Sequence, residues 1–194
     1  MKILIVVDMQ NDFITGSLGS KEAEAIVGNV KEKIEEYKKN GDLIWYTMDT
    51  HDENYLNTLE GKGLPIPHCI KDTDGWKICD ALGVDYENDF IILKKIFGVI
   101  YLDECLIDAC EKFYERKISE HPDEDISDES MRVQSIEIVG LCTDICVVSN
   151  ALIAKSTFDV PVIVDASCCA GVTPEKHKAA IEVMKSCQIN VINE

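Results

Sequence analysis

The chain has 194 residues, of which 46% are hydrophobic and 28% are charged, and its formal net charge at pH 7 is −17. This composition is typical of a globular protein, and we expect a single domain over residues 1–194 with a substantial core. The acidic balance argues against a nucleic acid or an anionic membrane surface as a partner, because both bind through basic surfaces.

The cysteines indicate a reducing compartment. There are nine of them, an odd number for a disulfide framework, and none forms a C-x-x-C pair. No basic-then-apolar leader precedes MKILIVVDMQ, and no apolar stretch approaches the roughly 18 residues that a membrane span needs. We therefore expect reduced thiols, a cytoplasmic protein and no membrane partner.

Short apolar runs alternate with segments of helical periodicity. A continuous run such as KILIVV is typical of a parallel strand buried on both faces. Apolar residues three and four apart over 21–40 predict a helix that Asn40-Gly41 ends. The predicted strands are 2–7, 42–48, 90–95, 135–140, 160–165 and 189–192. The predicted helices are 21–40, 101–117, 143–158 and one that starts after Thr173-Pro174.

This alternation predicts an α/β fold, a three-layer α/β/α arrangement around a six-stranded parallel sheet with a strand order near 3-2-1-4-5-6. The active site of such a sheet lies beyond the carboxyl ends of the strands, where the order switches between strands 1 and 4. Segment 49–89 is too long for a simple connection, and we expect it to be functional. Segment 117–132 is acidic and predicts a solvated surface insertion.

Polar side chains follow most strands and should gather at one edge of the sheet. An acid, a lysine and a cysteine, Asp8, Lys94 and Cys146, would reach this edge from three different strands. Together they make a nucleophile with nearby proton carriers. The segments that follow the strands are 8–13, 49–51, 94–95, 141–144 and 165–167.

Each of these residues also has a simpler explanation. Asp8 could turn the chain, Lys94-Lys95 could be a solvated strand end, and Cys146 could be a buried core thiol. Their joint placement on one edge makes these explanations weaker. Spacing alone does not select the nucleophile, because three other cysteines lie near the same edge: Cys142, Cys168 and Cys169.

A second cluster predicts a divalent metal site. Asp49 and His51 form a D-x-H pair, and His68 follows within P-H-C. Three protein ligands would leave positions open for water or substrate. D-x-H alone is a weak signal, and two surface histidines are the alternative. His121 and His177 are expected to be surface residues.

Five motifs, in this order, resemble the isochorismatase-like cysteine hydrolases: VDMQNDFITGSLG, DTHDEN, PHCIKDTDGWKI, ILKKIFG and VGLCTDICV. The likeness covers nearly the whole chain. Within that superfamily the chain is most similar to the nicotinamidases, because the D-x-H and P-H-C elements mark its metal-binding amidases.

The resemblance implies roles for the residues of the first cluster. Asp8, Lys94 and Cys146 match the catalytic triad of the family. The Leu141–Cys142 bond matches a cis peptide, which would aim the backbone N–H groups of Cys142 and Cys146 at a developing oxyanion. The helix N-terminus and Lys94 favour the Cys146 thiolate and Asp8 opposes it, and we expect a thiol pKa below its usual value of about 8.5.

The resemblance also implies a cofactor. Asp49, His51 and His68 match the ligands of a divalent metal, and Glu60 stands where some relatives place a further carboxylate, direct or through water. Zn²⁺ is expected, with Fe²⁺ and Mn²⁺ as alternatives. The metal would orient the substrate and leave nucleophilic attack to the cysteine.

The chain departs from the nicotinamidase pattern around the ring site. Pro65 stands where an aromatic residue is common three positions before the P-H-C histidine, and Phe97 replaces a common tyrosine. Phe13 remains as a stacking candidate, so Phe13 and Phe97 are the predicted substrate-binding residues. Tyr55 and Asn57 stand where a second histidine is often found. These departures affect which ring-bearing substrate the site would accept.

The implied function is a metal-dependent cysteine amidohydrolase that converts nicotinamide to nicotinate and ammonia through a thioester. The partner would be a small-molecule amide, and a homo-oligomer is expected. The alternatives are a related hydrolase acting on another small amide, a carbamoyl compound or isochorismate, and a non-enzymatic thiol or metal binder. A nucleotide-binding sheet is disfavoured, because no G-x-G-x-x-G follows the first strand.

Overall fold

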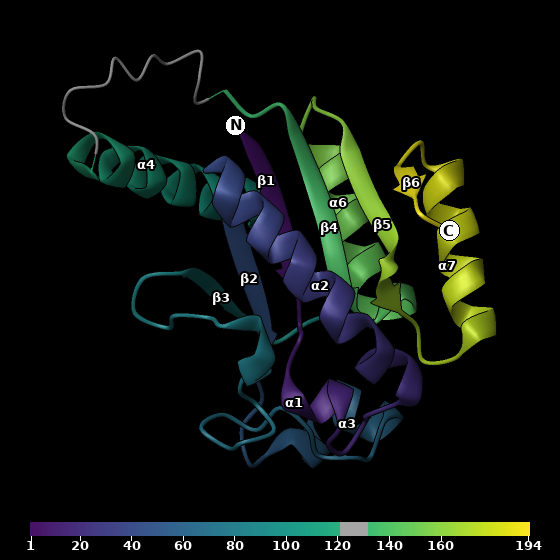
Figure 1. Ribbon diagram of the computed structural model, residues 1–194. Coiled ribbons are helices and arrows are strands. Elements are labelled where there is room, and N and C mark those ends of the chain that lie inside the picture. The colour runs from purple at the N-terminus through teal and green to yellow at the C-terminus, as the bar shows by residue number, and fades with distance from the viewer. Residues whose placement is uncertain (121–131) are drawn as a thin grey trace.

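Six parallel strands form one sheet in the order β3-β2-β1-β4-β5-β6 in the computed structural model, which describes residues 1–120 and 132–194 (Figure 1). The predicted α/β fold and strand order are confirmed. The strands are β1 Lys2–Val7, β2 Leu43–Asp49, β3 Phe90–Lys94, β4 Ser135–Leu141, β5 Val162–Ala170 and β6 Asn190–Ile192. The helices are α1 Asn11–Ile14, α2 Lys21–Asn40, α3 Leu59–Gly63, α4 Leu102–Glu120, α6 Val148–Thr157 and α7 Pro174–Ser186.

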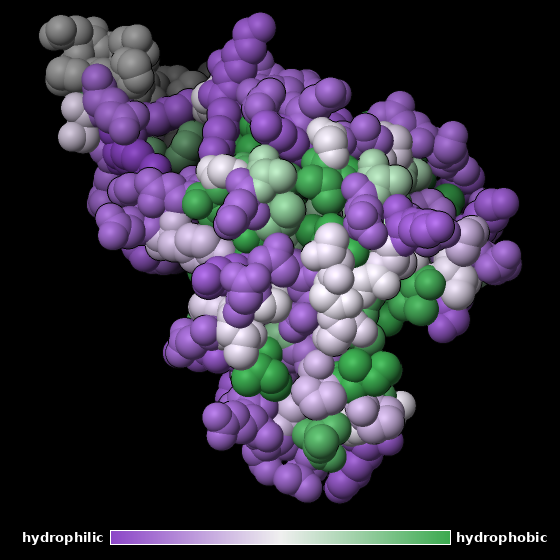
Figure 2. All heavy atoms as spheres, turned by 60° about the horizontal axis from the view of Figure 1, so that its bottom comes forward, coloured by the Kyte–Doolittle hydropathy of each residue, from purple (hydrophilic) through white to green (hydrophobic). Residues whose placement is uncertain are grey.

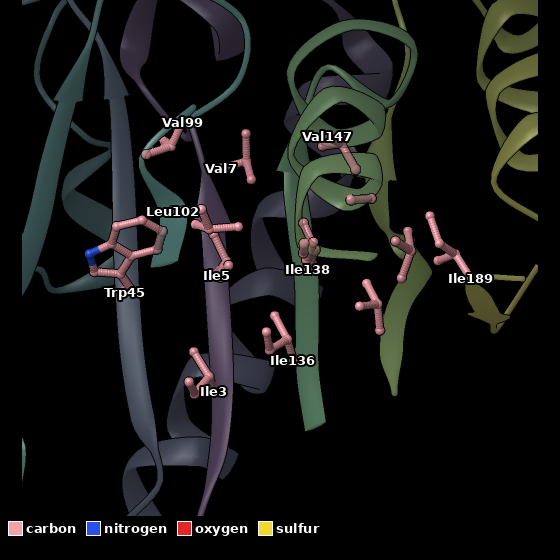
Figure 3. Packing of buried hydrophobic residues seen from close by; sticks show 14 of the residues in the cluster. Ile3, Ile5, Val7, Trp45, Val99, Leu102, Ile136, Ile138, Val147 and Ile189 are labelled. Carbon is pink, nitrogen blue, oxygen red and sulfur yellow. The ribbon is translucent and has the colours of Figure 1, made fainter. Parts of the chain in front are cut away.

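The central strand β1 is buried on both faces and separates two hydrophobic cores. Ile3, Ile5 and Val7 face the core that α4, α6 and α7 cover (Figure 3). Leu4 and Val6 face the core under α2. Each such side chain contributes roughly 1.5–3 kcal/mol when it is fully buried, so the continuous apolar run of β1 anchors both layers.

Capping residues fix the ends of the helices beside the strand carboxyl ends. The Ser20 side chain accepts a hydrogen bond from Ala23 N at the start of α2, and Gly41 ends that helix in the left-handed region at φ 67°. The Thr173 side chain caps α7 in the same way, directly before Pro174. Both starts agree with the sequence prediction.

Strand β5 is longer than predicted and changes the edge of the sheet. Its pairing with β4 shifts, so that Ile138 pairs with Val164 but Gly140 pairs with Cys169. Gly140 has φ 117°, and a Cβ there would lie 2.1 Å from the Val7 carbonyl oxygen. The prediction that 165–167 lies at the carboxyl edge is wrong, because this segment lies inside β5.

Two other boundaries differ from the prediction. The helix predicted at 143–158 begins as a π-helical turn, Thr143–Val147, that continues into α6. Helix α4 extends to Glu120, so the acidic segment 117–132 begins within a helix, while 121–131, with His121, lies outside the described residues. None of the described helices is both long enough and apolar enough to cross a membrane.

Asp165 belongs to a buried charged cluster beneath α2. Lys33 Nζ lies 2.8 Å from Glu137 Oε1 and 3.0 Å from Asp165 Oδ2. The Tyr37 hydroxyl donates to Glu137 Oε2 at 2.7 Å. One lysine thus compensates two carboxylates that are almost fully removed from water.

Replacing Lys33 should therefore destabilise the fold. Lys33→Met leaves both carboxylates buried without a cation, and we expect the free energy of unfolding to fall by about 3 kcal/mol. Chemical denaturation measures this, with Lys31→Met as a control because Lys31 is exposed on the same helix and loses the same charge. Equal stability of the two variants would contradict the role of the cluster.

Candidate active site

A cavity of about 580 Å³ lies at the carboxyl ends of the strands. This is the end of the sheet where α1 and α3 lie in Figure 1. Several hydrophobic side chains are exposed on the same face (Figure 2), and Leu59, Phe97 and Val172 are exposed side chains that also line the cavity. The predicted position of the site, beyond the strands where their order switches, agrees with the cavity.

Asp8, Lys94 and Cys146 come together below the cavity, and all three are buried. Lys94 Nζ lies 2.6 Å from Asp8 Oδ2 and 3.5 Å from Cys146 Sγ. The lysine therefore contacts both the acid and the thiol. Its neighbour Lys95 is exposed, so it does not share this position.

Asp8 is held by the second strand. It follows β1 in the left-handed region, at φ 47°, which an aspartate tolerates better than most residues. The Thr47 hydroxyl donates to Asp8 Oδ1 at 2.7 Å, and Asp8 N donates to the Thr47 carbonyl oxygen at 3.2 Å. One carboxylate oxygen is thus fixed by Thr47, and the other faces Lys94.

Burial dominates the electrostatics of these three groups. It raises the pKa of the Cys146 thiol well above its usual value; Asp8 raises this pKa further, and Lys94 lowers it. Burial also raises the pKa of Asp8, against the effect of Lys94. Burial lowers the pKa of Lys94, but the charges of Asp8, Cys146 and Asp49 outweigh this and raise it. The expected low pKa of Cys146 is therefore wrong in sign.

The turn that carries Cys146 follows a cis peptide bond between Leu141 and Cys142. The Cys142 carbonyl oxygen accepts hydrogen bonds from Ile145 N and Val147 N. Within the described residues, Cys142 N donates no hydrogen bond to the protein. This N–H group is free to bind a ligand.

The other cysteines near this edge occupy different environments. Cys168 and Cys169 lie in β5 and pack into the two hydrophobic cores. Cys142 lines the cavity beside Cys146, and burial, followed by the charge of Asp144, raises its pKa to about 12. Among the described cysteines only Cys146 contacts Lys94. The contact with Lys94 thus distinguishes Cys146 from the other cysteines, which sequence spacing alone could not do.

Four predicted ligand residues form a second cluster at the end of β2. Asp49 Oδ2 lies 2.9 Å from His51 Nε2 and 3.3 Å from His68 Nε2. Glu60 Oε1 lies 3.8 Å from His51 Nε2 and 3.7 Å from His68 Nε2. All four ligand atoms lie within 4.8 Å of one another, so they could surround one metal ion.

Neighbouring groups orient these ligands. Gln10 accepts from Asp49 N at 2.7 Å and donates to the Asp49 carbonyl oxygen at 2.8 Å. His68 Nδ1 lies 2.9 Å from the Ile66 carbonyl oxygen, which leaves Nε2 for the cluster. The buried ring of Tyr55 packs against His51 and His68, with ring centroids 4.6 and 4.9 Å away.

The predicted ring-binding residues line the cavity. Phe13 is buried, with its ring 5.4 Å from that of His68. Phe97 is 47% exposed at the mouth. Pro65 is exposed and is absent from the cavity wall, where its neighbour Leu64 stands. The wall on this side is therefore aliphatic.

Sequence reasoning missed several supporting residues. His177, expected on the surface, is half-buried on α7, and its Nδ1 lies 2.8 Å from the hydroxyl of Thr143, at the start of the nucleophile turn. Asn150 binds the Phe97 and Cys146 carbonyl oxygens and Val99 N. No signal in one sequence identifies the contacts of His177 with Thr143 or of Asn150 with Phe97 and Val99, because each joins segments more than 30 positions apart.

Comparison with known proteins identifies the family of this chain. A family model for the isochorismatase domain matches residues 2–194. The chain belongs to the isochorismatase family. A nicotinamidase from Schizosaccharomyces pombe is 27% identical to this chain over 214 residues, covering 98% of this chain and 92% of the relative.

Two further proteins similar to this chain are informative. A crystal structure of a pyrazinamidase from Pyrococcus horikoshii in complex with zinc has a TM-score of 0.73 at 29% identity, covering 100% of this chain and 99% of that one. An Arabidopsis thaliana protein named "probable inactive nicotinamidase" is 28% identical over 94% of this chain and 87% of its own. Activity must therefore be argued from the site.

Alkylation of Cys146 should follow the charges around it. Asp8→Asn removes a negative charge that raises the thiol pKa, so iodoacetamide should modify this variant faster than wild type near pH 8. Lys94→Met removes the opposing charge and should slow modification. A pKa change of one unit corresponds to about a tenfold change in thiolate fraction.

Peptide mass analysis of Cys146 against time and pH measures both effects, and Lys95→Met serves as the control. Equal rates for Lys94→Met and Lys95→Met would show that Lys94 has no electrostatic effect on the thiol.

Proposed function

We propose that this chain is a metal-dependent cysteine amidohydrolase that converts nicotinamide to nicotinate and ammonia. The observation that carries the proposal is Lys94 Nζ, buried 2.6 Å from Asp8 and 3.5 Å from Cys146 beneath a cavity. A buried acid, cation and thiol at a cavity floor suit nucleophilic catalysis with proton transfer. Family membership and the relatives support an amide-hydrolysing enzyme.

In the first half-reaction Asp8 accepts the thiol proton as Cys146 Sγ attacks the carboxamide carbon. Burial raises the pKa of Asp8, which makes its carboxylate a stronger base for this step, and Lys94 opposes the rise in the pKa of the thiol. Lys94 compensates the negative charge that the pair carries throughout. The N–H groups of Cys142 and Cys146 stabilise the oxyanion. Asp8 then protonates the leaving ammonia.

The second half-reaction releases the acid. Water attacks the thioester carbon, Asp8 accepts its proton, and the Cys146–acyl bond breaks. Asp8 returns the proton to the sulfur, so the enzyme regains its starting state. Phe13 and Phe97 would contact the ring during both steps, because both line the cavity.

The donor set at the end of β2 fits a divalent metal. Two imidazoles and two carboxylates, from His51, His68, Asp49 and Glu60, suit Zn²⁺, with Fe²⁺ and Mn²⁺ as alternatives. The His68 Nδ1 contact with the Ile66 carbonyl oxygen is the support expected for a ligand histidine. When bound, the metal would supply a positive charge that orients the ring nitrogen or a water. The zinc-bound pyrazinamidase structure supports this assignment.

Ammonia release from nicotinamide tests the proposed reaction, with and without chelator. Cys146→Ala should abolish release, because the nucleophile is lost. Cys142→Ala should retain substantial activity, because only its backbone N–H group is used. Comparable losses in both variants, or turnover by Cys146→Ala, would rule out the assignment. Circular dichroism checks that both variants fold.

The metal site has its own test. His51→Ala and His68→Ala should each lose bound metal and raise the KM for nicotinamide, because a ligand and its orienting effect are removed. His177→Ala is the control, since His177 lies outside the four-residue cluster. Elemental analysis after gel filtration gives the answer, and full metal retention in either ligand variant would exclude that residue.

A further inference from the structure

The cavity has two halves with different linings. One half adjoins the four predicted metal ligands and is also lined by Leu64 and Phe97. The other half is lined by residues at the starts of α2 and α7 and on the nucleophile turn, with side chains from Leu18, Ser20, Ala23, Ile145, Val172 and Lys176. We call this second part the α2–α7 half. The proposed reaction with nicotinamide assigns it no role.

Strand order places the two halves on opposite sides of the nucleophile. Asp49 ends β2, Cys146 follows β4, and Val172 follows β5. The sheet order is β2-β1-β4-β5, so the metal cluster and the α2–α7 half flank Cys146. Neighbouring strands lie about 4.8 Å apart, so the cavity continues about one strand spacing beyond the nucleophile.

The size of the cavity indicates a substrate larger than one ring. A volume of about 580 Å³ falls in the range of roughly 300–1,000 Å³ that holds drug-sized ligands. A single ring with a carboxamide, held between Cys146 and the metal cluster, would leave the α2–α7 half without a substrate group. That space is available for a group attached on the far side of the reacting carbon.

The chemistry of the α2–α7 half specifies this group. Leu18, Ala23, Ile145 and Val172 provide apolar walls, which suit a short hydrocarbon chain. Lys176 is the cation lining this half, and it forms no ion pair with any residue in 1–120 or 132–194. Lys176 is exposed, and an ammonium group beside apolar walls suits a terminal carboxylate.

We propose that the chain also hydrolyses N-substituted amides whose amine part is a short methylene chain ending in a carboxylate. This inference rests on the proposed function, because it needs the acyl ring on the metal side of Cys146. With the ring fixed there, the amide nitrogen is the atom through which a substituent enters the α2–α7 half. The Lys176 ammonium then binds the carboxylate.

The reaction balances as it does for ammonia. Cys146 Sγ forms a bond to the carbonyl carbon, and the thiol proton passes through Asp8 to the amide nitrogen. The C–N bond then breaks, and a primary amine leaves instead of ammonia. Water cleaves the thioester to give the same carboxylic acid and the free thiol.

Three substrates test the proposal: nicotinamide, N-butylnicotinamide and N-nicotinoyl-4-aminobutyrate. Nicotinate formation is measured for each by chromatography. We expect the 4-aminobutyrate derivative to exceed N-butylnicotinamide in kcat/KM by about tenfold, as for one charge-assisted contact. Turnover of nicotinamide alone would overturn this inference and leave the proposed function intact. No turnover of any of the three would instead contradict the proposed function.

Two pairs of variants locate the group. Val172→Trp should narrow the α2–α7 half and lower the kcat/KM ratio of the 4-aminobutyrate derivative to nicotinamide by about tenfold. Val183→Trp is its control, because Val183 is also 48% exposed but lies outside the cavity wall. Lys176→Met should lower the ratio of the carboxylate substrate to N-butylnicotinamide, and the matched Lys178→Met should not. If each variant and its control give the same kcat/KM ratio, the substituent does not bind in the α2–α7 half and the inference is contradicted.

Discussion

The site depends on one buried cation. Lys94 reaches from the end of the edge strand β3 to the acid that follows β1 and the thiol that follows β4. Removing an ammonium group from water costs several kcal/mol unless opposite charges and hydrogen bonds offset it. Asp8 at 2.6 Å and Asp49 at 3.7 Å provide that offset, so Lys94 stays charged at this depth. The parallel strand order β3-β2-β1-β4 places Lys94, Asp8 and Cys146 at the same end of the sheet, where they can meet.

Much of the fold could be predicted because its signals are local. The continuous apolar run of β1, the periodicity of α2 and the caps at Ser20 and Thr173 are all readable within a short window of sequence. The predicted strand 160–165 ends earlier than β5, because an aspartate such as Asp165 is typical of the position that follows a strand. Its carboxylate is instead compensated by Lys33, more than 100 positions earlier in the chain. Strand β5 continues past Asp165 to Ala170 through a shifted pairing with β4. Such compensation has no local signature.

The candidate site divides in the same way. The positions of Asp8, Lys94 and Cys146 at strand ends could be read from the order of elements, and the resemblance added their expected roles. The direction of the shift in the Cys146 pKa could not be read from the order of elements. It depends on the depth of burial and on the balance between the charges of Asp8 and Lys94. The packing of Tyr55 against His68 and the contact of His177 with Thr143 also arise only when separate segments of the chain meet.

The side chain of Asn150 has a mechanical consequence. It is fully buried and its amide binds the carbonyl oxygen of Cys146, the carbonyl oxygen of Phe97 and the N–H group of Val99. Each such bond contributes about 1 kcal/mol net, and leaving a buried partner unsatisfied costs more. Asn150 therefore ties the segment at Phe97 to the turn that carries Cys146. Moving Phe97 outward would break these hydrogen bonds or draw the Asn150 amide away from the Cys146 carbonyl oxygen.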